Sequence, residues 1–86
     1  MPVKVLIPTP LRPYTDQKEA VEIEGAHVRE LLDNLTERYR DLRKHLFDDS
    51  GKLRSFVNVY VNEDDIRSLA RFETAVAETD VVSIVP

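Results

Sequence analysis

The C-terminal stretch Thr79-Asp80-Val81-Val82-Ser83-Ile84-Val85-Pro86 is an acidic turn followed by a short alternating strand and a proline. The N-terminal stretch Val3-Lys4-Val5-Leu6-Ile7-Pro8 alternates in the same way, with β-branched residues on one face. The chain therefore carries a strand at each of its two ends. Both strands need central places in one sheet, so we expect them to pair in parallel.

Between these strands the sequence predicts one long helix. Six apolar residues recur at helical spacing, and the opposite face is charged, which is typical of an amphipathic helix over about Val28 to Arg40. The six are Val28, Leu31, Leu32, Leu35, Tyr39 and Leu42. His27 stands at the start of this helix, where Ser, Thr or Asp is preferred, so we expect the start to be poorly capped.

The remaining strand signals are shorter. Glu19 to Glu24 and Phe56 to Val61 alternate as strands, and Ile66-Arg67 is a candidate short edge strand. The helix is the only element long enough to cover the apolar face of the resulting sheet. The predicted fold class is α+β: a β-grasp (ubiquitin-like) domain with a mixed sheet of four to five strands packed on one main helix. Residues 1–86 are expected to form this single domain.

The connecting segments are predicted from their turn-forming residues. Thr9 to Asp16 contains two prolines and is expected to be a loop, since proline cannot donate to a strand ladder. Residues 41–47 are expected to extend the helix or to form a separate turn that returns to the core. Asp48-Asp49-Ser50-Gly51 is a turn signal. Residues 71–77 are expected to be irregular or to form a single helical turn.

The composition of the chain excludes several classes of protein. The 42% hydrophobic and 33% charged fractions are typical of a folded globular protein. With a net charge of −4 and no basic stripe, nucleic acid is not an expected partner. No apolar run of membrane-spanning length and no signal peptide is recognisable, so no membrane partner is expected. Because cysteine is absent, there are no disulfides, which suits a cytoplasmic location.

No familiar catalytic or metal-binding pattern is present. Gly25 and Gly51 are isolated and cannot form a phosphate-binding loop. The spacing of His27 and His45 does not suit a metal, so a role flanking the helix explains them better. Asp48 to Gly51 lacks the alternating acidic spacing of a calcium loop. We therefore expect no catalytic residue, no metal site and no bound cofactor.

A candidate binding surface is predicted on the sheet face that points away from the helix. Strand alternation directs four large apolar side chains to this face. They are Leu6, Phe56, Tyr60 and Val85. Such a patch exceeds what solubility requires, and exposed apolar patches mark partner sites. Scattered surface hydrophobic residues, or partial cover by the loops at Leu11 and Leu69, are the alternatives.

Over nearly its whole length the sequence resembles the MoaD/ThiS family of ubiquitin-like sulfur carriers. The resemblance rests on the first strand, the helix, the third strand and the last strand. The matching segments are Val3-Lys4-Val5-Leu6-Ile7-Pro8, Val28-Arg29-Glu30-Leu31-Leu32-Asp33-Asn34-Leu35, Val57-Asn58-Val59-Tyr60-Val61-Asn62 and the ending from Asp80 to Pro86. Pro8 to Pro13 together with Phe56 to Arg67 most resembles the CysO-type branch, whose members deliver sulfur for cysteine synthesis.

The resemblance implies that the chain is a carrier and not an enzyme. In this family an adenylating enzyme activates the C-terminal carboxylate with ATP, a sulfur donor converts it to a thiocarboxylate, and an acceptor enzyme takes the sulfur. Family members continue a few residues past this proline to a terminal Gly-Gly, so we expect such a tail after Pro86. Pro86 itself is then expected to belong to the partner-binding surface. The alternatives are the small subunit of molybdopterin synthase and a tailless ubiquitin-like interaction module.

Overall fold

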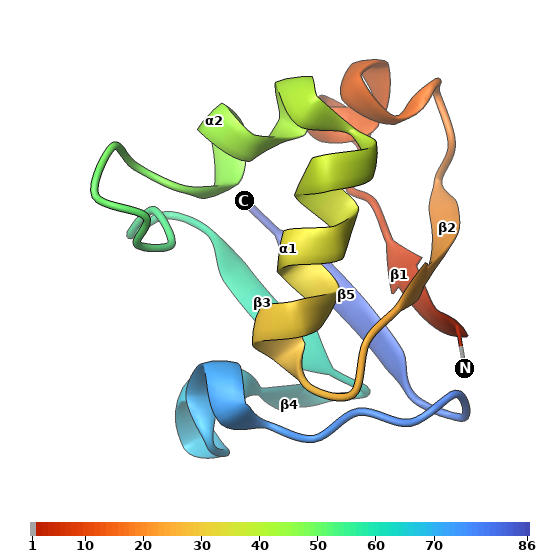
Figure 1. The fold of residues 1–86 in the computed structure, drawn as a ribbon, viewed down its shortest axis with the longest axis vertical. Helices are drawn as coiled ribbons and strands as arrows, with labels where there is room; N and C mark the ends of the chain where they lie inside the picture. Colours follow the sequence, from red (N-terminus) through yellow and green to blue (C-terminus); the bar gives the residue numbers. More distant parts are fainter. Residues whose placement is uncertain (1) are drawn as a thin grey trace.

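A computed structural model describes residues 2–86 and shows a single five-stranded sheet with a helix packed across one face (Figure 1). The strands are β1 (Pro2–Leu6), β2 (Ala20–Glu24), β3 (Asn58–Val61), β4 (Asp64–Asp65) and β5 (Val81–Val85). They lie in the order β2-β1-β5-β3-β4. The terminal strands β1 and β5 pair in parallel, as predicted, while the other neighbours are antiparallel. This mixed sheet on one main helix is the predicted β-grasp architecture.

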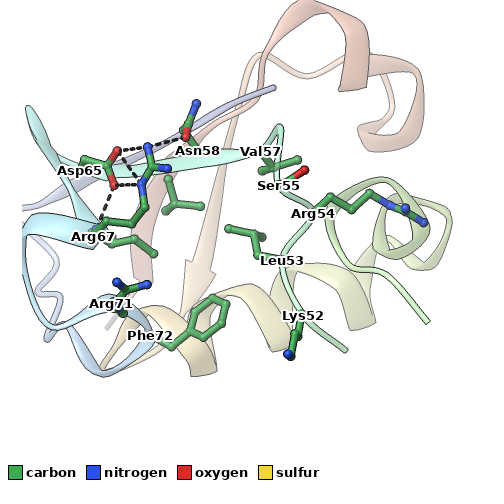
Figure 2. A pocket seen from close by; sticks show the side chains of 12 residues that line it. Lys52, Leu53, Arg54, Ser55, Val57, Asn58, Asp65, Arg67, Arg71 and Phe72 are labelled. Carbon is green, nitrogen blue, oxygen red and sulfur yellow. Dashed lines mark hydrogen bonds and ion pairs between the residues drawn. The ribbon is translucent and has the colours of Figure 1, made fainter. Parts of the chain in front are cut away.

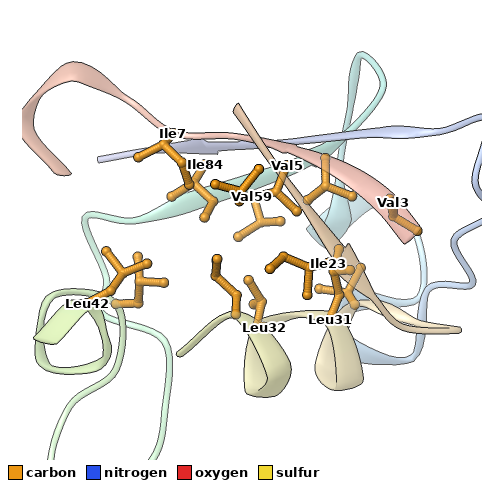
Figure 3. Close-up of a cluster of buried hydrophobic side chains, with 14 of the residues drawn as sticks. Val3, Val5, Ile7, Ile23, Leu31, Leu32, Leu42, Val59 and Ile84 are labelled. Atoms are coloured by element: carbon orange, nitrogen blue, oxygen red, sulfur yellow. The ribbon is translucent and has the colours of Figure 1, made fainter. Parts of the chain in front are cut away.

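The main helix α1 (Val28–Arg38) ends two residues before the predicted Arg40. Its apolar stripe is buried, and Figure 3 shows Leu31 and Leu32 pointing at the branched side chains of the strands. Those strand side chains are on the inner face, because alternate strand residues point to the same side of the sheet. The inner-face residues, all buried, are Val3, Val5, Ile7, Val21, Ile23, Val57, Val59, Val61, Val82 and Ile84.

The start of α1 is better capped than the sequence suggested. His27 is the N-cap residue, and its Nδ1 accepts a hydrogen bond of 3.4 Å from the backbone N–H of Glu30. The Glu30 carboxylate in turn accepts a hydrogen bond of 2.7 Å from the N–H of Ala26. The expectation of a poorly capped start was therefore wrong, because the His27 side chain accepts from a backbone donor of the first turn and the Glu30 side chain accepts from the backbone N–H just before the N-cap.

Short helices replace two segments that were predicted to be loop or continuous helix. Thr9–Thr15 forms the 3₁₀ helix η1 and not a loop, since the fixed φ of proline is compatible with a 3₁₀ turn. After α1, the chain forms the 3₁₀ turn η2 (Arg40–Leu42) and the separate short helix α2 (Arg43–Leu46). Leu42, Leu46 and Phe47 return to the core, as predicted.

The edge of the sheet beyond β3 differs from the predicted one. β3 begins at Asn58 and not at Phe56, and the edge strand β4 comes before Ile66-Arg67. Ile66–Ser68 forms the 3₁₀ helix η3, because the Asp65 side chain accepts a hydrogen bond from the Arg67 N–H and so starts a helical turn. Residues 71–73 form the 3₁₀ helix η4 (Arg71–Glu73), the single helical turn expected there. Across residues 2–86 no helix combines the length and apolar character that crossing a bilayer requires.

Candidate functional site on the open sheet face and at the C-terminal exit

The sheet face opposite α1 carries the predicted surface residues in two adjacent rows. Leu6 of β1, Ser83 of β5 and Tyr60 of β3 are register partners across three neighbouring strands. In the next row, Val85 of β5 is paired with Asn58 of β3. Leu6 is 37% exposed, Val85 is 42% exposed and Tyr60 is half-buried. The structure therefore places Leu6, Tyr60 and Val85 on one open face, where partner binding stays a prediction.

Phe56 is set apart from these rows. It precedes β3 in a turn in which the Val57 N–H donates to the Arg54 carbonyl at 2.9 Å. Its ring is 60% exposed. It lines a groove together with Pro86, the residue that follows β5. Phe56 thus lies beside the point where the C-terminal end of the chain leaves the sheet. It is not part of the row that holds Tyr60.

This groove, which we call the exit groove, has a volume of about 520 Å³. Its walls come from η1, from α2 and from the segment before β3. The lining residues are Pro10, Leu11, Tyr14, Lys44, His45, Arg54, Phe56 and Pro86. The Tyr14 and His45 rings stack with their centroids 4.1 Å apart, which joins η1 to α2. The loops at Leu11 and Leu69 were considered as possible cover for the apolar patch. Leu11 is buried in the exit groove, whereas Leu69 is 42% exposed.

Sequence reasoning did not find Tyr14, Lys44 or Arg54 as candidate site residues. None of the three follows a strand or helix periodicity, because they lie in short helices and turns. The one available signal was the cluster of prolines and apolar residues from Pro8 to Tyr14. That signal predicts a turn and gives no information about which distant segment packs beside it.

The charge of the exit groove is opposite to that of the whole chain. The cationic side chains of Lys44 and Arg54 line it, and none of its lining residues is acidic, although the net charge is −4. Arg54 is held in place because its Nε donates to the Lys44 carbonyl at 2.8 Å. A concave apolar surface with a basic rim can recognise a partner.

A hydrogen-bonded network fixes the polar edge of the open face (Figure 2). The Arg67 guanidinium lies 2.7 Å from the Asp65 carboxylate and donates at 2.8 Å to Oδ1 of Asn58. Hydrogen bonds from the Arg67 side chain, and then from its backbone N–H, hold the pKa of Asp65 below its ordinary value of 3.8. The same ion pair raises the pKa of Arg67. Two ions thus hold the end of β4 against β3.

The segment Asp48 to Gly51 forms the predicted turn. Oδ1 of Asp48 accepts hydrogen bonds from the Ser50 N–H, the Ser50 hydroxyl and the Lys52 N–H. These bonds, that of the Ser50 hydroxyl first, lower the pKa of Asp48. The carboxylate is therefore engaged by its own turn. Among residues 2–86 no three histidine or acidic side chains converge in a way that would hold a metal ion.

Comparison with known proteins finds the same kind of relative by sequence and by fold. A model of the ThiS family matches residues 5–86. The sulfur carrier protein CysO of Mycobacterium tuberculosis is 40% identical over 88 residues, covering 100% of this chain and 95% of the relative.

Two solved structures show that the similarity extends to the three-dimensional fold. The crystal structure of Mycobacterium tuberculosis CysO has a TM-score of 0.89 at 40% identity and covers 98% of this chain and 97% of that chain. A chain in the crystal structure of the Amycolatopsis orientalis BexX/CysO complex also has a TM-score of 0.89, at 38% identity, with coverages of 98% and 93%. These findings confirm the predicted resemblance, including its CysO-type branch. The chain belongs to the ThiS family of ubiquitin-like sulfur carriers and is a homologue of CysO.

Proposed function

We propose that this protein carries sulfur on its C-terminal carboxylate for an acceptor enzyme, in the synthesis of cysteine or of a related sulfur metabolite. The observation that carries the proposal is the 40% identity to a sulfur carrier protein along the entire chain. The proposed carrier acts as a cosubstrate, because the reacting group is its own terminal carboxylate, on which the partner enzymes act. It binds no cofactor of its own, and ATP is consumed by its activating partner.

The chemistry takes place on the terminal carboxyl group. An adenylating enzyme joins the carboxylate to AMP from ATP and releases pyrophosphate, which turns a poor electrophile into an activated acyl group. A sulfide-equivalent donor then displaces AMP at the carboxyl carbon and leaves a thiocarboxylate. The acceptor enzyme transfers the sulfur to its substrate, and water attacks the acyl carbon, breaks the C–S bond and restores the carboxylate.

The fold supports this chemistry through the position of β5. β5 lies between β1 and β3 at the centre of the sheet, so the C-terminal exit at Pro86 follows a strand that is paired on both sides. We propose that a short tail ending in Gly-Gly follows Pro86. At about 3.3–3.6 Å per residue, four or five such residues reach at most roughly 18 Å into a partner's channel.

The proposed partners are the adenylating enzyme and the acceptor enzyme, bound through Leu6, Tyr60 and Val85 on the open face and through Phe56 and Pro86 at the exit groove. Exposed apolar residues beside a reactive tail let an enzyme hold the domain while the tail reacts. The related Amycolatopsis orientalis carrier was crystallised as a BexX/CysO complex, which supports a protein partner for this chain. We propose a cytoplasmic location, which the absence of cysteine supports.

The experiment compares two forms of the protein, one ending at Pro86 and one extended by a few residues to Gly-Gly. Each is incubated with a CysO-type adenylating enzyme, ATP and a sulfide source, and its intact mass is measured. A gain of about 16 Da, one oxygen replaced by sulfur, is expected on the extended form alone, since only its carboxylate can be presented for acyl chemistry. An extended form whose penultimate and last glycines are both alanine is the matched control.

The outcomes separate the candidate functions. An equal mass gain on both forms contradicts the role of the tail. If neither form gains sulfur with any cognate enzyme, the tailless interaction module replaces the carrier. If sulfur is delivered only when the large subunit of molybdopterin synthase is the acceptor, the small-subunit alternative is correct.

A further inference from the structure

The exit groove holds two cations that no neighbouring acid neutralises. Lys44 and Arg54 line it, and neither forms an ion pair within the part of the chain that the structure describes. Hydrogen bonds of its own turn, that of the Ser50 hydroxyl first, lower the pKa of Asp48, and the charge of Arg54 adds least to this shift. Both cations are therefore available to an anion from outside the chain.

Two hydrogen bonds fix Arg54 against the end of α2. Its backbone N–H donates to the Leu46 carbonyl and its Nε donates to the Lys44 carbonyl, both at 2.8 Å. Figure 2 shows the Arg54 side chain directed away from Leu53 and Phe72. Within residues 2–86 the Nε bond is the one hydrogen bond of this guanidinium. Its terminal N–H groups are thus open to a carboxylate, which arginine binds through two parallel hydrogen bonds.

Apolar surface adjoins the two cations. The Phe56 ring is 60% exposed, and Pro10 and Leu11 line the same groove. The stack of Tyr14 on His45, with ring centroids 4.1 Å apart, holds the walls from η1 and α2 together, so the groove is formed before a partner arrives. An occupant that suits this surface combines a carboxylate with an apolar side chain.

The position of the exit groove indicates which protein supplies that occupant. Pro86 lines the groove, so a partner seated there lies beside the base of the proposed tail, whereas a second copy of this chain would block the exit. The adenylating enzyme has to attract a terminal carboxylate and the phosphates of ATP, so its active site needs positive charge. The basic rim of the carrier would be repelled by that charge unless an acidic segment of the enzyme lies opposite it.

We propose that the exit groove binds an acidic loop of the adenylating enzyme, which places a carboxylate between Lys44 and Arg54 and an apolar side chain against Phe56. This inference rests on the proposed carrier function. A tail of four or five residues spans at most roughly 18 Å, so the acidic loop lies at the entrance of the channel and the ATP phosphates lie at its far end.

The first test uses a blocked pentapeptide in which aspartate alternates with leucine. It is titrated into the full chain and followed by amide chemical shifts in solution NMR. We expect saturable shifts at Tyr14, Lys44 and Phe56 and no shift at Leu6. Added salt should weaken binding, because the ion pairs are exposed. The peptide with lysine in place of aspartate should not bind, and the peptide with glycine in place of leucine should bind more weakly.

A reversal of charge separates recognition from stability. Lys44→Glu should weaken the aspartate peptide about fivefold, as the loss of an exposed ion pair permits, and should bind the lysine peptide that the parent rejects. Lys52→Glu, the same change at an exposed lysine outside the exit groove, should leave both affinities as they are in the parent. A variant that had merely lost its fold could not gain affinity for the opposite charge.

The second test uses the adenylating enzyme with the Gly-Gly-extended form. Lys44→Glu should raise the KM for the carrier about fivefold and leave kcat level, because the groove binds the enzyme and does not touch the reacting carboxylate. If the extended parent gains no sulfur, the carrier function fails, and the peptide titration still decides on the groove. If the parent gains sulfur and Lys44→Glu keeps the parental KM, the groove proposal fails and the carrier function stands.

The proposal is also overturned if the aspartate peptide causes no saturable shift at Tyr14 and Phe56, or if the lysine peptide binds equally well. Shifts of the free protein at Lys44 that grow with protein concentration would show a second copy in the groove instead. If the extended form shows the same shifts without any peptide, and amidation of its terminal carboxylate abolishes them, the chain's own tail occupies the groove and the proposal is wrong.

Discussion

The two faces of the same strands have opposite environments. Val5 and Val82 on the inner face are completely buried, whereas their sequence neighbours Leu6 and Ser83 point away from α1. Residue by residue, β1, β3 and β5 therefore alternate between a side chain that stabilises the fold and one that is available to a partner. The consequence is that stability and recognition can be changed independently in this domain, even at adjacent positions.

The largest effect is expected where α1 meets the inner face. Leu35 is completely buried in mid-helix, so Leu35→Ala should lower the free energy of unfolding by about 2–5 kcal/mol, through lost burial and the cavity left behind. Denaturant unfolding measures the loss. Glu37→Ala on the exposed face of the same helix should stay within about 0.5 kcal/mol. If the two variants lost equal stability, the two-faced description of α1 would be wrong.

A smaller loss is expected at the connection between β2 and α1. A Cβ added at Gly25 would lie 2.9 Å from the backbone N and Cα of Leu31. Gly25→Ala should therefore cost about 1–3 kcal/mol by overpacking. Thermal unfolding, compared with Ala26→Gly at the neighbouring position, would check this prediction. A variant as stable as the parent would show that α1 shifts freely on the sheet.

Substitutions of the exposed aromatic residues should have the opposite effect. They should weaken binding to a partner and change the free energy of unfolding little. Tyr60→Ala and Phe56→Ala should each weaken binding to the adenylating or acceptor enzyme by about 1–3 kcal/mol, as central aromatic contacts do. Calorimetric titration measures the affinity, and Leu69→Ala, which removes an exposed apolar side chain elsewhere, is the control. Unchanged affinity for Tyr60→Ala would exclude the open face as the partner surface, and unchanged affinity for Phe56→Ala would exclude the exit groove.

The smallest effect is expected at the polar edge of the open face. The pKa of Asp65 is depressed in the fold, so its ion pair stabilises the fold at pH values above the ordinary pKa of 3.8. This contribution is lost as the pH falls through the lower folded-state pKa. NMR titration should give a midpoint below 3.8 in the parent protein and a midpoint closer to 3.8 in Arg67→Ala. Lys18→Ala should leave the midpoint where it is in the parent; a parent midpoint at 3.8 would contradict the depressed pKa.

Local periodicity was sufficient to predict the framework of the fold from the sequence alone. The alternation of Val3, Val5 and Ile7 and the helical spacing of Leu31, Leu32 and Leu35 identify which side chains are buried. Both patterns follow from the geometry of a single element, so no knowledge of its neighbours is needed. The outward direction of Leu6, Tyr60 and Val85 could be predicted in the same way, whereas the parallel pairing of β1 with β5 was predicted from the need of both strands for central places in one sheet.

Only the tertiary structure decided how the short segments meet. The exit groove exists because η1 and α2, which are distant in sequence, bring Tyr14 against His45 beside Pro86. β4 ends after two residues because the Asp65 side chain caps the 3₁₀ helix η3, which packs against β3. These features depend on contacts between segments that carry no periodic signal. The sequence by itself therefore determined the framework of the fold, and tertiary packing determined its surfaces.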